Sequence, residues 1–229
     1  MHDDAGVARV PRNISSFGRS FPALPSVLLF FIALSVLMAQ TSFPRVEMSP
    51  PKALRQHLEA LAQALRARND SALPAAALRQ LTVILAEEHP ERLTAQVQAL
   101  LDPYCLAAVH INPQSRVKVS RGPWPAALIA KKSVTVLVKI HNEGGVTQGP
   151  AVRDLWHERE RHWLELDLRA PTGKHRLTGQ PLEYHLLRLT AHATGKREAV
   201  LVFDVGQGTQ DLGFRAELPV LFTIVERSE

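Results

Sequence analysis

The most suggestive catalytic pattern in the chain lies between His157 and His162, where two histidines enclose alternating glutamates and arginines. A zinc-protease helix carries its histidines at positions i and i+4, so that both imidazoles reach one ion, and a glutamate beside the first histidine acts as the base. Here the separation is five residues, which turns the second imidazole away from the first on a regular helix. We therefore interpret the segment as a solvated run of charges.

The ten histidines invite a metal-site hypothesis, but their spacing does not support one. The sequence contains no His-x-His pair. His185 and His192 stand seven residues apart on an expected strand, which places them on opposite faces. His110 and His141 could meet across neighbouring strands, although two hydrogen-bonded structural histidines explain them more simply. The sequence therefore predicts no metal ligand.

A glycine-rich turn after an expected strand has part of the pattern of a dinucleotide-binding loop. That loop needs a third glycine and a helix whose N-terminus faces the pyrophosphate. Gly206 and Gly208 supply two glycines, but Asp211 stands at the third position and no amphipathic helix follows. A hairpin or bulge loop explains the glycines, so we predict no cofactor.

The remaining candidates for acid, base or nucleophile also have structural explanations. Glu165 and Asp167 share one face of an expected strand, but Arg169 continues that face, which indicates an ion-paired stripe. The single cysteine, Cys105, lies among apolar residues with nothing nearby in sequence to lower its pKa, so we expect a small buried side chain. No catalytic residue is predicted, and the chain is expected not to be an enzyme.

The N-terminal 39 residues are predicted to form a leader. An uncharged apolar run from Ala23 to Ala39 follows three arginines, at positions 9, 12 and 19. This order is typical of a signal peptide cleaved after Ala39, and the run is also close to the minimum length of a membrane anchor. We predict an extracytoplasmic protein, periplasmic or secreted; the alternative is a single-pass membrane protein with a cytoplasmic N-terminus.

After a linker at 40–49, residues 50–103 have the pattern of a small helical region. Leu54, Leu58, Leu61 and Leu65 recur at spacings of four, three and four residues, which lines one helix face. A second helix is expected from Pro74 to about Glu88 with Leu81 and Val83 among its apolar residues, and a third from Pro90 to Leu101. We predict two to three packed helices.

Residues 104–229 change to short alternating runs separated by turn residues, which is typical of a β-sandwich. In one run Val134, Val136, Val138 and Ile140 point to the same face. Seven such runs predict a mainly β fold with a seven-stranded immunoglobulin-like sandwich. The expected strands are 106–111, 116–120, 133–141, 163–169, 182–192, 196–205 and 219–226.

Several stretches of this β region resemble the N-terminal part of secreted, PHP-type metal-dependent hydrolases of the CehA/McbA family. The resemblance covers about residues 100–224 and is carried by strand and turn motifs at 101–106, 110–119, 136–147, 177–184 and 195–213. In that family a downstream domain binds divalent metal and performs hydrolysis. The resemblance therefore implies an accessory architecture and an extracytoplasmic setting, and it assigns no catalytic residue here.

We predict a non-catalytic secreted or membrane-tethered accessory module that acts by surface recognition. The formal net charge of +5 is not concentrated in a basic, aromatic-rich patch, so nucleic acid is not expected as a partner. The expected partner is a protein or an attached catalytic domain. Alternatives are a fragment of a metallohydrolase whose active site lies in a missing C-terminal domain, or a carbohydrate-binding module that takes a polysaccharide. The candidate contact surface consists of Trp124, Arg153, Trp156, Arg159 and Arg161, although Trp124 could equally cap the sandwich.

Overall fold

A computed structural model of the chain describes residues 43–155, 163–206 and 212–226. The chain divides into two compact units, residues 1–39 and 40–229, and all described residues belong to the second. The expected leader from Ala23 to Ala39 lies outside the described residues. Among the helices that are described, none is both long enough and apolar enough to cross a membrane.

Three helices precede the sheets: α2 (Pro51–Arg66), α3 (Ala75–Ile84) and α4 (Pro90–Leu101). α2 and α4 begin with proline. Proline has no backbone N–H, and the N–H groups of the first helical turn have no hydrogen-bond partner within the helix, so proline costs no hydrogen bond there. The predicted face of α2 is confirmed, because its four leucines are at most 1% exposed. In α3 Leu81 is buried as expected, but Val83 is 73% exposed. A step of two residues carries a side chain to the other side of a helix.

The described residues form nine strands, so the predicted number of seven is wrong. Two strands were missed because runs of three and four residues are too short to show an alternating pattern: β3 (Ala127–Ile129) and β5 (Ala151–Asp154). The seven expected strands are present with small shifts of their ends: β1 (Cys105–Ile111), β2 (Val117–Arg121), β4 (Ser133–Asn142), β6 (Leu164–Arg169), β7 (Leu182–Ala191), β8 (Gly195–Asp204) and β9 (Arg215–Val225). Two short 3-10 turns complete the described elements, η1 (Asp102–Tyr104) and η2 (Leu212–Phe214).

The strands form two sheets, a five-stranded sheet in the order β2-β1-β4-β7-β6 and a four-stranded sheet in the order β3-β9-β8-β5. Most neighbours are antiparallel, but β1 runs parallel to β4 and β3 runs parallel to β9. Both edges of the four-stranded sheet are short strands, an arrangement that limits edge-to-edge association. The mainly β class predicted from the sequence is confirmed.

One hydrophobic core fills the space between the two sheets. Val136, Val138 and Ile140 point into it from β4, as their alternation predicted, and each is at most 1% exposed. Phe203 and Phe222 enter the same core from the four-stranded sheet. The two sheets therefore form a sandwich, and its centre is among the best-buried parts of the described chain.

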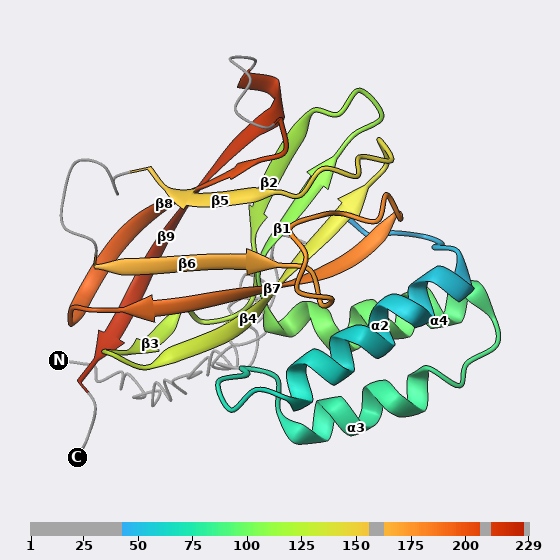
Figure 1. Ribbon diagram of the computed structural model, residues 1–229, viewed down its shortest axis with the longest axis horizontal. Helices are drawn as coiled ribbons and strands as arrows, with labels where there is room; N and C mark the ends of the chain where they lie inside the picture. The colour runs from blue at the N-terminus through green and yellow to red at the C-terminus, as the bar shows by residue number, and fades with distance from the viewer. Residues whose placement is uncertain (1–42, 156–162, 207–211, 227–229) are drawn as a thin grey trace, which may run out of the picture. The chain divides into compact units, whose positions relative to one another are not determined.

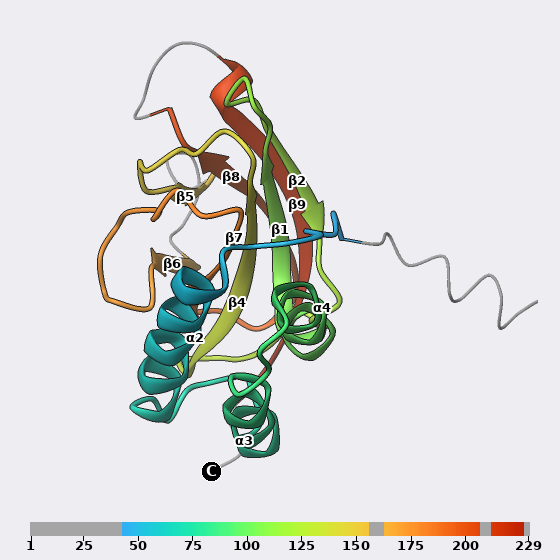
Figure 2. The same ribbon diagram turned by 90° about the vertical axis from the view of Figure 1, so that its right-hand side faces the viewer.

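A second core lies on the other face of the five-stranded sheet. Leu137, Tyr184 and Leu186 point away from the sandwich and pack against the helices. Figure 1 shows the three helices grouped together beside β4 and β7, and in Figure 2 α2 and β9 lie on opposite sides of β4. The result is three layers, helices, five-stranded sheet and four-stranded sheet, so that the middle sheet is buried on both faces.

Candidate functional site

Three side chains with metal-ligating atoms meet on the helix-side face of the five-stranded sheet, where β1 and β4 end. His110 Nε2 lies 2.9 Å from Glu143 Oε2, and His141 Nε2 lies 3.6 Å from Glu143 Oε1. The two imidazole rings stack with centroids 4.6 Å apart and planes inclined by 20°. One ligating atom from each residue lies within 4.8 Å of the other two, so the group could hold a metal ion. We call this group the His-His-Glu cluster.

The sheet order explains why these residues meet. β1 and β4 are parallel neighbours, and His110 stands directly opposite His141. Side chains of residues in register on neighbouring strands point to the same face. Glu143 follows His141 by two residues and its N–H donates to Ile111 O at 2.8 Å, which continues the pairing beyond the strand. The sequence suggested that the two histidines could meet, but it gave no signal that Glu143 would join them.

A tight loop holds Glu143 in place. The Asn142 side chain donates to Val146 O at 2.8 Å and accepts from Val146 N–H at 3.0 Å, which closes the loop on both sides. A Cβ on Gly144 would lie 2.7 Å from Asn112 O, so only glycine fits there. Gly145 has φ of +61°, a conformation that glycine adopts without strain. The carboxylate therefore sits on a rigid support.

The protonation states in the cluster follow from its surroundings. Burial lowers the pKa of His141, and the neighbouring His110 lowers it further. The hydrogen bond from His110 lowers the pKa of Glu143. Glu143 is therefore ionised at neutral pH and His141 is neutral. Among the described residues, His141 Nδ1 is one of three buried side-chain atoms without a hydrogen-bond partner.

A second polar group lies beneath the helices, two residues back along β4. Lys139 Nζ donates to Asp102 Oδ2 at 2.8 Å, and the Tyr184 hydroxyl donates to Asp102 Oδ1 at 2.8 Å. The Lys139 side chain is only 1% exposed, and its ammonium lies 5.6 Å from the centre of the Phe43 ring. A surface hollow of about 740 Å³ has Phe43, Asp102 and Lys139 among its lining residues. This network ties η1 to the centre of the sheet.

Burial dominates the electrostatics of this network. It raises the pKa of Asp102, against the opposing effect of the Lys139 charge. It also raises the pKa of the Tyr184 hydroxyl and of the Cys105 thiol well above their ordinary values. A thiol that stays protonated is a poor nucleophile. Cys105 is buried and free, as predicted.

A third polar group is enclosed where α2 meets the free edge of β7. His57 Nε2 lies 2.9 Å from Tyr184 N and 3.1 Å from Tyr184 O. Burial lowers the pKa of His57 to about 4. The neutral ring therefore accepts the Tyr184 N–H, and it covers a stretch of β7 that β6 does not pair, because β6 ends opposite Leu186.

Two more buried groups lie close to His57. Glu183 Oε2 lies 3.4 Å from His185 Nε2, and both side chains are at most 1% exposed. Glu183 Oε1 accepts the backbone N–H of Thr178 at 2.9 Å. Burial on its own would raise the pKa of Glu183, but the hydrogen bond from His185 and the histidine charges lower it overall. The pair fastens the loop before β7 to the sheet.

The contact residues predicted from the sequence lie in different environments. Trp124 is 8% exposed and belongs to the sandwich core, which favours the capping alternative over a surface contact. Its N–H donates to Cys105 O at 3.2 Å, in a turn after β2 that folds back onto β1. Arg153 is exposed on β5. Trp156, Arg159 and Arg161 lie outside the described residues.

Two of the catalytic patterns in the sequence lie at least partly outside the described residues. The run from His157 to His162 lies outside the described residues, and so do Gly208 and Asp211 of the glycine-rich turn. His185 and His192 contact different carboxylates, since His192 Nε2 lies 2.9 Å from Glu165 Oε1.

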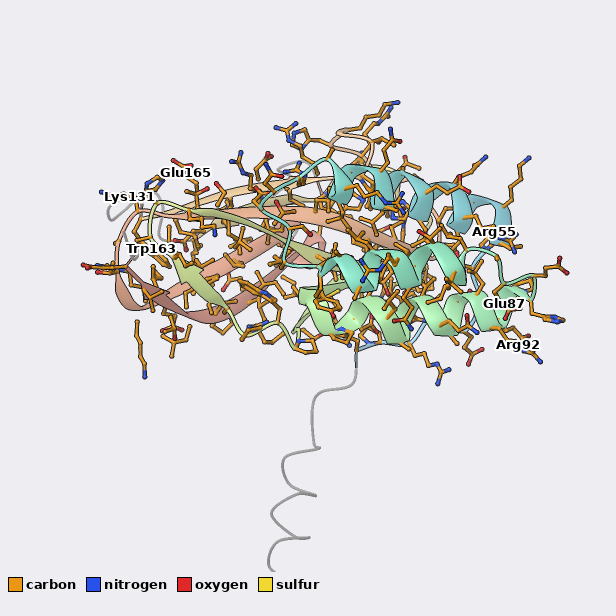
Figure 3. All side chains as sticks on the ribbon, turned by 90° about the horizontal axis from the view of Figure 1, so that it is seen from below. Arg55, Glu87, Arg92, Lys131, Trp163 and Glu165 are labelled. Carbon is orange, nitrogen blue, oxygen red and sulfur yellow. The ribbon has the colours of Figure 1, made fainter. Side chains whose placement is uncertain are left out.

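The predicted ion-paired stripe on β6 is confirmed, because Arg169 Nε donates to Asp167 Oδ2 at 2.8 Å. Trp163 packs against Phe222 with ring centroids 6.0 Å apart. In Figure 3, Trp163 and Glu165 lie at the end of the molecule opposite Arg55 and Glu87. The charged side chains of β6 are therefore paired with neighbouring residues and have a structural role.

No protein-family model matches the chain, and no curated protein matches it significantly.

Proposed function

We propose that the chain is an exported, non-catalytic accessory module that binds a protein partner through the outer face of its four-stranded sheet. The observation that carries the proposal is a row of exposed side chains on β9, in which Leu221 is 60% and Val225 is 53% exposed. Large aliphatic side chains gathered on one face of a soluble domain are typical of an interaction site.

The surface extends over three strands. Leu221 stands opposite Glu198, Thr223 stands opposite Lys196, and β3 continues the face beyond β9. We call this surface the β9 face and define it by its exposed residues: Ala127, Lys196, Glu198, Glu217, Pro219, Leu221, Thr223 and Val225. An apolar centre bordered by charges of both signs resembles the core and rim of a protein interface. The helices cover the other sheet, so they leave this face open within the described part of the chain.

The aliphatic character of the β9 face supports a protein partner over a polysaccharide. Sugar rings are usually bound by stacking on aromatic side chains. The large exposed hydrophobic residues of the described chain are Met48, Val83, Leu221 and Val225, all aliphatic. The carbohydrate-binding alternative therefore has less support from the described residues.

We infer that seven of the nine strands, β3 to β9, form an immunoglobulin-like unit. In that fold the second, fifth and fourth strands are neighbours in one sheet, and the third, sixth and seventh make the other. Counted from β3, the order β4-β7-β6 and the order β9-β8-β5 follow this arrangement, whereas the first strand, β3, pairs with β9 and not with β4. The β1–β2 hairpin and the helices are then additions to the unit.

The resemblance to CehA/McbA-family hydrolases identifies the partner that we propose. In that family the accessory region accompanies a metal-dependent catalytic domain, which the β9 face would contact either within one longer chain or between chains. A fragment of such a hydrolase would use the same surface for the catalytic domain of its own longer chain; the test below addresses contact between separate chains.

That test is co-purification of the tagged chain from its source cells, with identification of the retained proteins by mass spectrometry. The wild-type chain should retain a metal-dependent hydrolase. Leu221→Lys should reduce the amount of retained hydrolase about tenfold or more, because binding would bury an unpaired charge away from water at the centre of an apolar interface. Val83→Lys, at a 73% exposed position on α3, is the matched control and should retain the hydrolase. Equal retention by the Leu221 variant would refute the proposal, as would a homodimer of the chain that this variant dissociates.

Export is tested separately. Intact-mass measurement and cell fractionation of the chain from a secreting host should give a species that begins at Gln40 in the extracytoplasmic fraction. A full-length membrane species would favour the anchor, and a full-length cytoplasmic species would refute export.

A further inference from the structure

We propose that the His-His-Glu cluster binds one divalent transition-metal ion of the zinc type, with His110 Nε2, His141 Nε2 and a Glu143 carboxylate oxygen as ligands. The cluster lies on the helix-side face of the five-stranded sheet, and the β9 face belongs to the other sheet. This inference is therefore independent of the proposed function, and either can fail without the other.

The distances between the donor atoms fit such an ion. Zinc binds imidazole nitrogen at about 2.0–2.1 Å and carboxylate oxygen at about 2.0–2.2 Å, so that donors of a tetrahedral site lie about 3.3 Å apart. His110 Nε2 lies 2.9 Å from Glu143 Oε2, and His141 Nε2 lies 3.6 Å from the other oxygen, Oε1; one ligating atom of each residue lies within 4.8 Å of the other two. Because the two imidazole rings are stacked at 20°, their side chains must rotate for both Nε2 atoms and one Glu143 oxygen to bind one ion.

The type and number of the donors select the class of metal. Two histidines and one glutamate are the protein ligands of a zinc site that leaves a fourth position open for water. Imidazole nitrogen suits zinc, copper, nickel and iron, whereas calcium and magnesium prefer oxygen ligands. Zinc is therefore the appropriate probe, and calcium and magnesium serve as negative controls.

The surroundings support the site without blocking it. Two of the three ligands are on neighbouring strands in register, and the third is on the loop closed by Asn142, so the backbone already holds the three side chains together. The side chain of Glu143 is 41% exposed and that of His110 is 27% exposed, which leaves a route for the ion and a bound water. Two lysines share this face. Lys139 is already paired with Asp102, and Lys118, opposite His110, has an exposed side chain that can extend into solvent.

The experiment is zinc binding by the purified full-length chain after treatment with a chelator. Isothermal titration at pH 7 and metal analysis after gel filtration should give one tightly bound zinc per chain and no binding of magnesium or calcium. His110→Gln and Glu143→Gln should each weaken zinc binding about a hundredfold or more. Even the loss of a group that only supports a metal ligand typically costs 10- to 100-fold.

The matched control is His192→Gln. His192 and Glu165 form another exposed histidine–carboxylate pair at 2.9 Å, but among the described residues no third ligand joins them, so this variant should bind zinc like the wild type. Nitrogen NMR of the wild-type chain provides a measurement that needs no variant, because zinc should shift the Nε2 resonances of His110 and His141. The proposal is overturned if the wild type binds no stoichiometric zinc, if the two ligand variants bind it as well as the wild type, or if those resonances do not move.

Discussion

Replacement of His57 by glutamine should remove a large part of the acid sensitivity of the fold. His57 is enclosed between α2 and β7, and its Nε2 accepts the backbone N–H of Tyr184 at 2.9 Å. A protonated ring would place a charge in this enclosed space. Its Nε2 would carry a hydrogen and could no longer accept the Tyr184 N–H. Glutamine is close in length and keeps an acceptor, but it does not titrate.

The magnitude follows from the pKa of His57, which burial lowers from 6.5 to about 4 in the folded chain. Because the unfolded chain takes up a proton on this residue near pH 6.5 and the folded chain does so only near pH 4, stability falls as the pH falls between these values. The difference of about 2.5 units corresponds to a loss of about 3 kcal/mol in the free energy of unfolding. The full stability from this residue is present above pH 6.5, and below pH 4 no more is lost.

The assay is urea unfolding of the wild type and His57→Gln at several pH values from 7 to 4. The wild type should lose about 3 kcal/mol more than the variant over this range. His175→Gln, which changes an exposed histidine, should follow the wild type. Parallel stability curves for the wild type and His57→Gln would refute the assignment of a buried neutral histidine.

Three further predictions concern the cores. Asp102→Asn should lower the free energy of unfolding by about 3 kcal/mol, because it leaves the buried ammonium of Lys139 without a counter-charge; adding Lys139→Met should restore most of the loss, measured by urea unfolding. Cys105 should resist iodoacetamide in the folded chain and react after denaturation, measured by mass spectrometry, because burial keeps its thiol protonated and covered. Phe222→Ala should cost about 3–5 kcal/mol in unfolding free energy, whereas Val83→Ala should cost less than about 0.5 kcal/mol.

Each of these has a clear contrary result. A double variant no more stable than Asp102→Asn would mean that the Lys139 charge is not the source of the cost. Alkylation of the native thiol at the denatured rate would show that the helix layer opens readily. Similar losses for Phe222→Ala and Val83→Ala would contradict the position of the sandwich core.

The elements that depend on local pattern were predicted well. The spacing of the leucines predicted the buried face of α2, and the prolines at the start of α2 and α4 indicated where these helices begin. Both signals involve only residues that are near neighbours in the sequence. The alternating valines of β4 likewise predicted the face that enters the sandwich. Where the pattern was too short, as in β3 and β5, the prediction failed.

The environment of single side chains was harder to predict. Trp124 stands between two prolines and has the local features of an exposed loop, yet it is buried because the turn after β2 folds back onto Cys105. Lys139 lies in an alternating strand at a position that would face water in a simple sandwich. It is buried because the helices cover that face of the sheet.

The sequence by itself determined the helices, most of the strands and the mainly β class, because these arise from periodicity over a few residues. Only the tertiary structure decided which chemical groups meet. His57 reaches Tyr184 across 127 residues, and His110 meets His141 and Glu143 because β1 lies parallel to β4. The order of strands in a sheet is set by how whole layers pack, and no local spacing in the sequence specifies it. The His-His-Glu cluster was therefore visible in the sequence only as two histidines with a possible contact, and the fold brought the carboxylate to them.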